Sequence, residues 1–353
     1  MEKKKAVVLI SGGLDSTLAT HIMLQLGIEL VGVHFTGIFC KCPSAKTSCI
    51  ALAHEIASKI NIPIKTFFKG MDYLEMVKTA PHGYGRGLNP CIDCRIYILK
   101  KVRTLMSEVN ASFIVTGEVI GQRPMSQHKK AMEIIEKESG TNGLILRPLS
   151  AHLLPPTIPE IKGIVDRNKL LAFSGRSRIP QMKLARSLGL KDYPCPSGGC
   201  LLTDRNVAIR VADLFLHKSD FTLNDARLTT FGRHFRLDER VKIVLGRNKH
   251  ENERLFSMGK TCFTLYIPEN FPGPTALVPE SEVDESYDEI ICGIVAFYSR
   301  NKVSGMIRKY SAKIQRIIHL PEPLSEEVIK RINIINFSFH RICQNMKTFE
   351  RQT

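Results

Sequence analysis

The residues best suited to chemistry form a short run at positions 11–17, with the sequence Ser-Gly-Gly-Leu-Asp-Ser-Thr. An apolar run at 6–10 precedes it and an amphipathic stretch at 18–26 follows it, so we expect a strand–loop–helix corner. Two glycines let a ligand come close to the backbone. Three hydroxyls and the free N–H groups of a helix start can donate hydrogen bonds to it. The run therefore predicts a phosphate-binding loop.

Known phosphate-binding patterns narrow this prediction. An ordinary capped turn would explain a bare Gly-Gly, but the Walker pattern needs a Lys and the dinucleotide fingerprint needs a third glycine, and neither is present. The whole run resembles the Ser-Gly-Gly-x-Asp-Ser signature of the PP-loop ATP pyrophosphatase superfamily, also called the adenine nucleotide alpha hydrolases. The resemblance implies cleavage of ATP between its α and β phosphates, adenylation of a carbonyl oxygen, and a role for Asp15 in holding Mg²⁺ or pyrophosphate.

A second reactive stretch contains Cys91-x-x-Cys94, which follows three glycines and opens a predicted helix. The field at a helix N-terminus favours thiolates, so this pair is reactive or metal-bound. By itself it fits half a zinc site, a redox pair or chance. A later irregular loop at 193–203, with two prolines and two glycines, presents Cys200, and Cys195 can face the same space.

The polar loop at 116–127 carries Thr-Gly-Glu-x-x-Gly-Gln and, further on, Ser-Gln. It resembles the PP-loop domain of the tRNA 4-thiouridine synthase family. A capped loop with Glu118 in a surface ion pair is the plain structural alternative. Arg147 follows in the next predicted strand, and we expect its guanidinium near phosphate or RNA, with a solvated salt bridge as the alternative.

Together the cysteines resemble the cluster-dependent branch of tRNA thiolation enzymes. That resemblance implies a four-iron four-sulfur cluster held by Cys91, Cys94 and Cys200, with one iron free to bind sulfide. A persulfide and disulfide pair of Cys94 and Cys200 remains an alternative, as does zinc bound by all four cysteines including Cys195. We interpret Cys40, Cys42 and Cys49 as incidental, with a second metal site as the alternative. We interpret Cys262, Cys292 and Cys343 as core or surface residues.

These residues need a scaffold that brings distant loops together. Apolar strands predicted at 30–35, 64–68, 111–116 and 144–150 alternate with helices after the first strand. This rhythm is typical of an α/β fold with a parallel sheet, where ligands bind beyond the carboxyl ends of the strands. We predict a PP-loop (HUP-like) ATP-binding and thiolation domain at 1–205, with adenine near residues 33–36.

After Thr203 the alternation stops, and a small α+β domain is predicted at 206–335, followed by a tail at 336–353 that we do not interpret. Several short motifs around residues 232–252 and 296–299 resemble the NFACT-R type of RNA-binding domain. A basic group with an aromatic residue among its members supports RNA binding, although a solvated basic face would look the same. The predicted RNA-binding residues are Arg147, Arg233, Arg236 and Arg247.

Composition narrows the partners. Fifty Lys and Arg against 34 Asp and Glu give the 353-residue chain a net charge of +16, which favours a polyanion such as tRNA. No apolar run reaches the about 18 to 20 residues that span a membrane, so we expect a cytoplasmic protein without membrane contact. Ten cysteines then suggest metal or redox chemistry rather than a disulfide framework. A homodimer is compatible with the sequence.

The sequence therefore predicts an ATP-dependent tRNA sulfurtransferase with ATP, Mg²⁺ and a 4Fe-4S cluster as cofactors, zinc being the alternative metal. Its sulfur donor would be sulfide or a cysteine desulfurase, and 4-thiouridine is favoured over 2-thiouridine as product. The alternative is a PP-loop amide synthase or ligase with structural zinc. The predicted catalytic residues are Asp15, Cys91, Cys94 and Cys200. The predicted ATP-binding residues are Ser11, Gly12, Gly13, Asp15, Ser16, Thr17, Thr116, Gly117 and Gln122.

Overall fold

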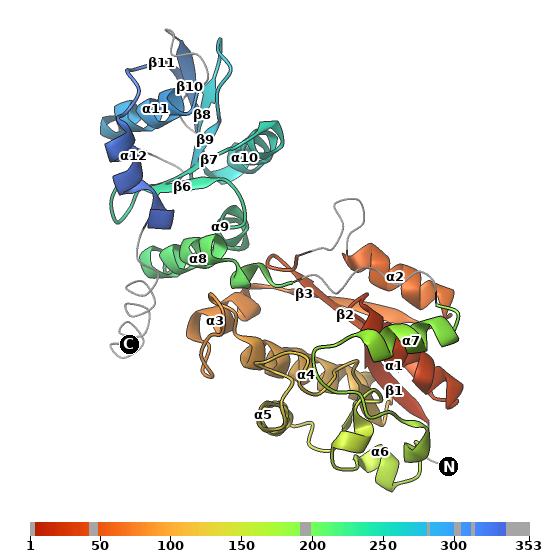
Figure 1. The fold of residues 1–353 in the computed structure, drawn as a ribbon. Helices are drawn as coiled ribbons and strands as arrows, with labels where there is room; N and C mark the ends of the chain where they lie inside the picture. Colours follow the sequence, from red (N-terminus) through yellow and green to blue (C-terminus); the bar gives the residue numbers. More distant parts are fainter. Residues whose placement is uncertain are drawn as a thin grey trace. The chain divides into compact units, whose positions relative to one another are not determined.

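The structure is a computed structural model that describes residues 4–41, 49–190, 199–280, 283–299, 305–311 and 315–336. Figure 1 colours the chain from its N-terminus to its C-terminus. The chain divides into two compact units, Met1–Thr203 and Asp204–Thr353. Within the described ranges no helix combines the length and the apolar character needed to cross a bilayer.

The first unit is built on a parallel sheet. Its strands stand in the order β3-β2-β1-β4-β5, and each pairs in parallel with its neighbours. Their bounds are β1 Lys5–Leu9, β2 Glu29–Gly37, β3 Ile64–Lys69, β4 Phe113–Val115 and β5 Ile145–Leu146. This confirms the predicted α/β fold with a parallel sheet. The strand order reverses direction at β1, so the loop after β1 lies at the switch point where such sheets bind ligands.

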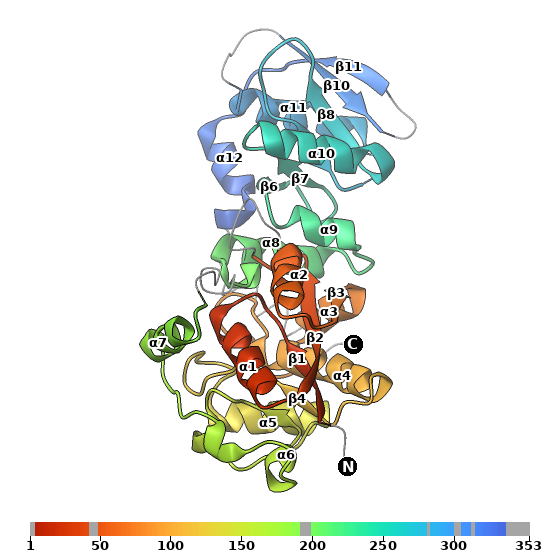
Figure 2. The same cartoon turned by 90° about the vertical axis from the view of Figure 1, so that its right-hand side faces the viewer.

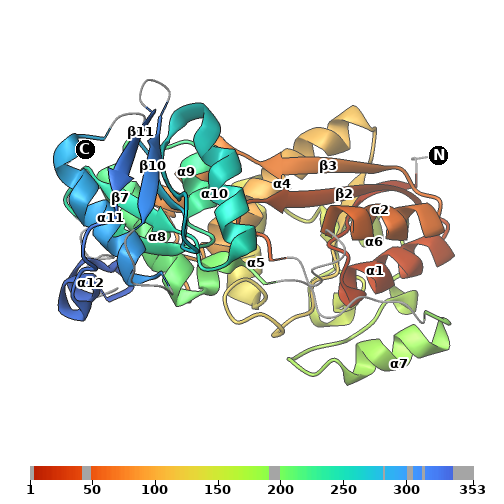
Figure 3. The ribbon, with the colours of Figure 1, turned by 90° about the horizontal axis from the view of Figure 1, so that it is seen from above.

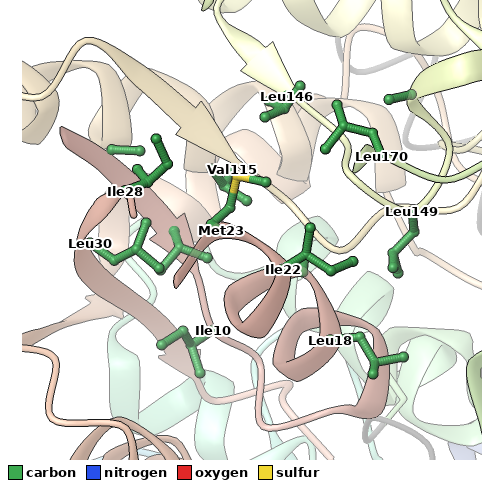
Figure 4. Packing of buried hydrophobic residues seen from close by; sticks show 14 of the residues in the cluster. Ile10, Leu18, Ile22, Met23, Ile28, Leu30, Val115, Leu146, Leu149 and Leu170 are labelled. Carbon is green, nitrogen blue, oxygen red and sulfur yellow. The ribbon is translucent and has the colours of Figure 1, made fainter. Parts of the chain in front are cut away.

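Helices cover both faces of this sheet. Successive β1 side chains point to opposite faces: Ala6 and Val8 join the core with α1, whereas Val7 packs against α4. Figure 1 shows α1, α2 and α7 on one side of the sheet and α4 with α5 on the other. Figure 3 shows α7 beside α1. Figure 4 shows the buried apolar side chains that pack around α1. The bounds are α1 Leu14–Gln25, α2 Cys49–Lys59, α3 Met71–Thr79, α4 Cys91–Glu108, α5 Lys129–Ser139, α6 Ile158–Ile161 and α7 Ile179–Ser187.

The second unit contains an antiparallel sheet in the order β11-β10-β8-β9-β7-β6. Helices α11 and α10 pack on its opposite faces (Figures 1 and 2). The helices are α8 Arg205–His217, α9 Leu223–Leu228, α10 Lys249–Cys262, α11 Asp288–Phe297 and α12 Glu326–Ile332. The strands are β6 Arg233–Arg236, β7 Lys242–Leu245, β8 Thr264–Pro268, β9 Ala276–Val278, β10 Met306–Tyr310 and β11 Gln315–His319.

The stretch at 233–245 forms a hairpin, in which β6 and β7 pair antiparallel through Arg233 and Leu245. Asp238 causes the break between the two strands, because its side chain accepts hydrogen bonds from the backbone N–H groups of Arg240 and Val241, which closes a turn.

Candidate functional site

The loop after β1 is a tight, internally bonded turn. Gly12 adopts φ +77°, a left-handed conformation that suits glycine, and Gly13 caps α1. The hydroxyls of Ser16 and Thr17 both donate to the Gly13 carbonyl, at 2.9 and 3.1 Å. Each hydroxyl has a single proton to donate, so these two do not offer it to a phosphate as the sequence had suggested. The free backbone N–H groups of the first turn of α1 remain as donors.

Asp15 points from this turn toward the loop after β4. Its Oδ2 accepts a hydrogen bond from Gln122 Nε2 at 3.1 Å and lies 3.6 Å from the Arg178 guanidinium. Its Oδ1 is buried and has no hydrogen-bond partner among the residues that the structure describes. A buried carboxylate oxygen without a partner is unfavourable unless a ligand or a cation binds it, so this atom suits the Mg²⁺ expected with ATP.

Gly117 allows the β4 loop to touch α1. A Cβ at this position would lie 2.5 Å from the backbone carbon of Asp15 and from the backbone nitrogen of Ser16. Only glycine permits this approach. Thr116, Gly117 and Gln122 therefore border the phosphate loop, as expected for ATP-binding residues.

One cavity of about 400 Å³ joins this loop to the cysteines. Its phosphate end is lined by Ser11, Gly12, Gly13, Asp15 and Ser16, and its sulfur end by Cys40, Lys69, Tyr73, Cys91, Cys94 and Cys200. His34 and Phe35, within the stretch expected to meet adenine, line it as well. The structure thus brings Cys91, Cys94 and Cys200 into one cavity with the predicted ATP-binding residues, except Thr17, which does not line it.

The first two cysteines are placed by the start of α4. Cys91 is the first residue of that helix and Cys94 lies on its first turn. His82 holds the segment that precedes these cysteines in place. Its Nδ1 lies 2.8 Å from Asp93 Oδ1, and its Nε2 lies 2.9 Å from Glu138 Oε1. Two side chains donate to the sulfurs: Asn89 to Cys91 at 2.9 Å and Tyr73 to Cys94 at 3.5 Å.

Cys200 enters the cavity beside a cysteine that sequence reasoning had set aside. Residues 39–41 pair antiparallel with residues 199–201, and Cys40 stands opposite Cys200. The flanking bonds run from Lys41 N to Gly199 O at 2.9 Å and from Leu201 N to Phe39 O at 2.8 Å. In such a non-hydrogen-bonded pair the two side chains lie close together. The clue in the sequence was the position of Cys40 just past the strand predicted at 30–35.

The remaining cysteines contribute less to this description. Cys42, Cys195 and Cys343 lie outside the described residues. The choice of Cys200 over Cys195 as the third cluster ligand therefore stays a prediction. Cys292 is buried in the core of the second unit, as expected. Cys49 begins α2 and Cys262 ends α10.

The electrostatics of the thiols reflect their burial. Burial and the neighbouring Cys94 raise the pKa of Cys91, although Asn89 opposes this shift. Burial raises the pKa of Cys200 to about 12. These thiols are therefore protonated when nothing binds them, and a metal that binds them must displace their protons.

Among the residues that the structure describes, no three His, Cys, Asp or Glu side chains form a group that could hold a metal ion as they stand. The donor chemistry does fit, because thiols from separate segments line one buried cavity and thiolates are the usual ligands of iron–sulfur clusters.

Glu118 and Arg147 form the buried support of the β4 loop. Glu118 Oε1 accepts from Arg95 at 2.6 Å, and its Oε2 accepts from Arg147 Nε at 3.0 Å. Burial opposes ionisation of Glu118, but the two guanidinium groups outweigh it and lower its pKa to about 2. Arg147 also donates to Glu136 at 2.6 Å and is 4% exposed. Its guanidinium is therefore an internal partner of two carboxylates and does not face a surface where RNA could bind.

Two of the other expected RNA contacts are also engaged within the protein. Arg236 makes a two-point ion pair with Asp213, at 2.6 and 2.8 Å. Arg247 is half-exposed and pairs with Glu251. Arg233 differs, since its guanidinium lies 4.6 Å from the centre of the Tyr298 ring. Both residues are half-buried, and a cation on an aromatic ring resembles the surfaces that bind phosphate and bases.

Two family models match the chain. Residues 2–152 match the model described as Thiamine biosynthesis protein (ThiI), and residues 232–331 match the NFACT protein RNA binding domain. The chain therefore carries a ThiI-type PP-loop domain followed by an NFACT-R-like domain.

Curated relatives resemble the first unit. A probable tRNA sulfurtransferase of Ureaplasma parvum is 32% identical over 153 residues, which are 42% of this chain and 37% of the relative. A tRNA-specific 2-thiouridylase MnmA of Pelotomaculum thermopropionicum is 31% identical over 135 residues, 33% of this chain and 35% of the relative. The chain thus spans little more than a third of the length of these relatives.

A solved complex of a 4-thiouridine synthetase with RNA and bound ATP is 19% identical and covers 53% of each chain. Its TM-score of 0.34 is too low to support a comparison of sites.

Proposed function

We propose that this chain is an ATP-dependent tRNA sulfurtransferase that adenylates a uridine carbonyl oxygen and exchanges that oxygen for sulfur. The observation that carries the proposal is the shared cavity, which holds a phosphate-binding loop at one end and four cysteines at the other. Uracil carbonyls are poor electrophiles, so adenylation supplies the leaving group that sulfur must displace. A chamber containing both functions lets the activated base meet sulfur without release into water.

The phosphate end of the cavity would bind ATP. The N–H groups at the start of α1 meet the phosphates, and the free Oδ1 of Asp15 holds Mg²⁺ or orients the pyrophosphate. Gln122 and Arg178 fix the other oxygen of the same carboxylate. Asp15 is thereby held in one orientation before ATP arrives, which is what electrostatic stabilisation of a developing charge requires.

Cys91, Cys94 and Cys200 are the proposed cluster ligands. A cluster bound through three thiolates would supply an iron site at which sulfide can bind. The chain's own contribution is to shield the thiols from solvent and to donate hydrogen bonds to two of them from Asn89 and Tyr73. Such donors stabilise negative charge on sulfur.

tRNA is the proposed partner. A relative of the first unit is a probable tRNA sulfurtransferase, residues 232–331 match an RNA-binding model, and the chain's net charge is +16. We propose that sulfide or a cysteine desulfurase donates sulfur and that 4-thiouridine is the product. The 2-thiouridylase among the relatives makes 2-thiouridine the next choice.

The test is a reaction of anaerobically purified protein with ATP, Mg²⁺, sodium sulfide and unmodified tRNA. Mass spectrometry of the digested tRNA separates 4-thiouridine from 2-thiouridine, and AMP is measured in the same samples. We expect one thionucleoside for each AMP and about four irons in each active chain, as for a four-iron cluster. Stoichiometric zinc without iron, together with amidation of a small carboxylate instead of thiolation, would support the amide ligase alternative.

Asp15→Asn tests the phosphate end. The substitution keeps the shape of the side chain and removes its charge, and AMP formation should fall by about 10²-fold, the usual effect of losing one preorganised charge-stabilising group. Asp72→Asn is the control, because Asp72 is half-exposed and pairs with Lys101. Equal loss in both variants would contradict a specific role for Asp15.

A further inference from the structure

Lys69 places an ammonium group at the sulfur end of the cavity. It is the last residue of β3 and stands opposite Gly37 of β2. A Cβ at position 37 would lie 3.0 Å from the Lys69 Cβ and 3.2 Å from its Cε. Glycine therefore leaves the path along which the lysine side chain reaches the cavity. The ammonium lies 4.8 Å from the centre of the Tyr73 ring.

The surroundings of this ammonium are thiols. Cys40 is hydrogen-bonded to Lys69, and Cys94 and Cys200 lie near enough to act on its charge. In the part of the chain that the structure describes, Lys69 has no carboxylate partner.

Lys69 is half-buried, and two fully buried lysines of the second unit show what a structural lysine looks like. Lys309, 1% exposed, lies 2.8 Å from Asp288 and donates to the Val283 carbonyl at 2.9 Å. Lys242 lies 2.8 Å from Asp213. A buried cation is costly unless it is paired, and both of these meet a carboxylate. Lys69 instead meets sulfur atoms and a cavity large enough for a ligand.

We propose that Lys69 is the anion-binding residue of the sulfur end, where its ammonium holds hydrosulfide beside Cys40, Cys94 and Cys200. Tyr73 and Asn89 donate to neighbouring sulfurs, so the whole end is built to stabilise negative charge on sulfur. Hydrosulfide as the natural anion rests on the proposed function. The anion site itself rests only on the geometry around Lys69. Lys69 acts by positioning the sulfur anion, and Cys40 is the thiol next to it.

Cys40 serves as a probe that does not depend on activity. It lies outside the predicted cluster ligands, so it can react with or without a bound cluster. The rates of its alkylation by iodoacetate, an anion, and by iodoacetamide, which is neutral, are measured by mass spectrometry. An ammonium beside the thiol attracts the anionic reagent, so the ratio of the two rates at Cys40 should exceed that of free N-acetylcysteine.

Lys69→Met removes the charge and keeps most of the length of the side chain. The ratio at Cys40 should fall about tenfold, in line with loss of one nearby charge in a partly buried site. Lys69→Arg should keep the ratio high. Lys65→Met is the matched control, because Lys65 lies on the same strand but is half-exposed and pairs with Glu108. An unchanged ratio in Lys69→Met would overturn the proposal.

Wild-type protein gives a second test that needs no variant to fold. Raising NaCl from 20 to 500 mM should lower the ratio at Cys40, because salt screens the attraction between the ammonium and iodoacetate. A ratio that equals that of N-acetylcysteine at every salt concentration would also overturn the anion site.

Hydrosulfide itself is tested by kinetics. In Lys69→Met the KM for sulfide in tRNA thiolation should rise about tenfold, by the same loss of one charge, while the KM for ATP stays unchanged. If tRNA is not thiolated by the wild type, the proposed function fails while the alkylation ratio still decides whether the anion site exists.

Discussion

The core of the second unit and the cavity of the first unit treat their charges in opposite ways. In the second unit, Asp213 accepts from Arg236 at 2.6 Å and lies 2.8 Å from Lys242, so each of these charged groups has a partner of opposite sign within the protein. In the cavity of the first unit, Asp15 keeps one oxygen without a partner and Lys69 meets thiols instead of a carboxylate. Charges that are paired internally hold a fold together, whereas incompletely paired charges in a cavity mark the place where a ligand completes them.

The largest expected loss of stability comes from breaking the buried ion-pair group of Asp213, Arg236 and Lys242. Asp213→Asn leaves Arg236 and Lys242 buried without their anion and should destabilise the second unit by about 3–5 kcal/mol. Hydrogen exchange of peptides from β6 and β7 measures this loss, while peptides from β1 and β2 should exchange as in the wild type.

Glu269→Gln is the matched control for Asp213→Asn. It removes a carboxylate from a surface ion pair with Arg308, in which the Glu269 side chain is 30% exposed, so its loss should cost much less than the loss of Asp213. If the two substitutions destabilise the second unit equally, burial does not separate structural from surface pairs in this chain.

Glu118 gives the next largest effect on stability. Its ion pairs with Arg95 and Arg147 show that the first unit also contains charges that are paired within the protein. Its pKa is lowered to about 2 from 4.5, so its stabilising contribution is present above pH 4.5 and is lost as the pH falls through this range. Between pH 6 and pH 3 the wild type should lose about 2 kcal/mol through this group.

Glu118→Gln isolates that contribution. The variant is less stable at pH 6, but its stability should fall less steeply on acidification, which denaturant unfolding of the first unit at the two pH values measures. Equal steepness in both proteins would mean that Glu118 is not held ionised by Arg95 and Arg147.

How well the sequence predicted these features depends on how local they are. The run at 11–17 and the Cys91 and Cys94 pair are contiguous, so their residue types alone indicated a phosphate loop and a helix-start thiol pair, and the structure places both in one cavity. Cys40 was set aside because its partner Cys200 lies far along the chain and only the pairing of residues 39–41 with 199–201 joins them.

Arg147 shows the same limit for charges. An arginine that binds RNA and an arginine that pairs with two buried carboxylates cannot be distinguished by residue type. Only the packing of Glu118 and Glu136 around it decides between them. The role of Lys69 was not predicted for the same reason, because the cysteines that it contacts are distant from it in the sequence.

The smallest expected effect concerns RNA. Arg233 is the predicted RNA-binding residue of the second unit whose guanidinium faces a ring rather than a carboxylate, at 4.6 Å from the Tyr298 centre. Arg233→Gln should weaken tRNA binding about fivefold and lower the slope of log affinity against log salt by about one, as for loss of one phosphate contact.

Arg308→Gln is the control for Arg233→Gln, because the Arg308 guanidinium is already engaged by Glu269 at 2.5 Å. Filter binding of labelled tRNA at several salt concentrations distinguishes the two. If both variants lose the same affinity and the same salt dependence, tRNA responds to the net charge of the unit alone. The contrast between paired and incompletely paired groups would then hold for the cavity of the first unit but not for an RNA surface on the second.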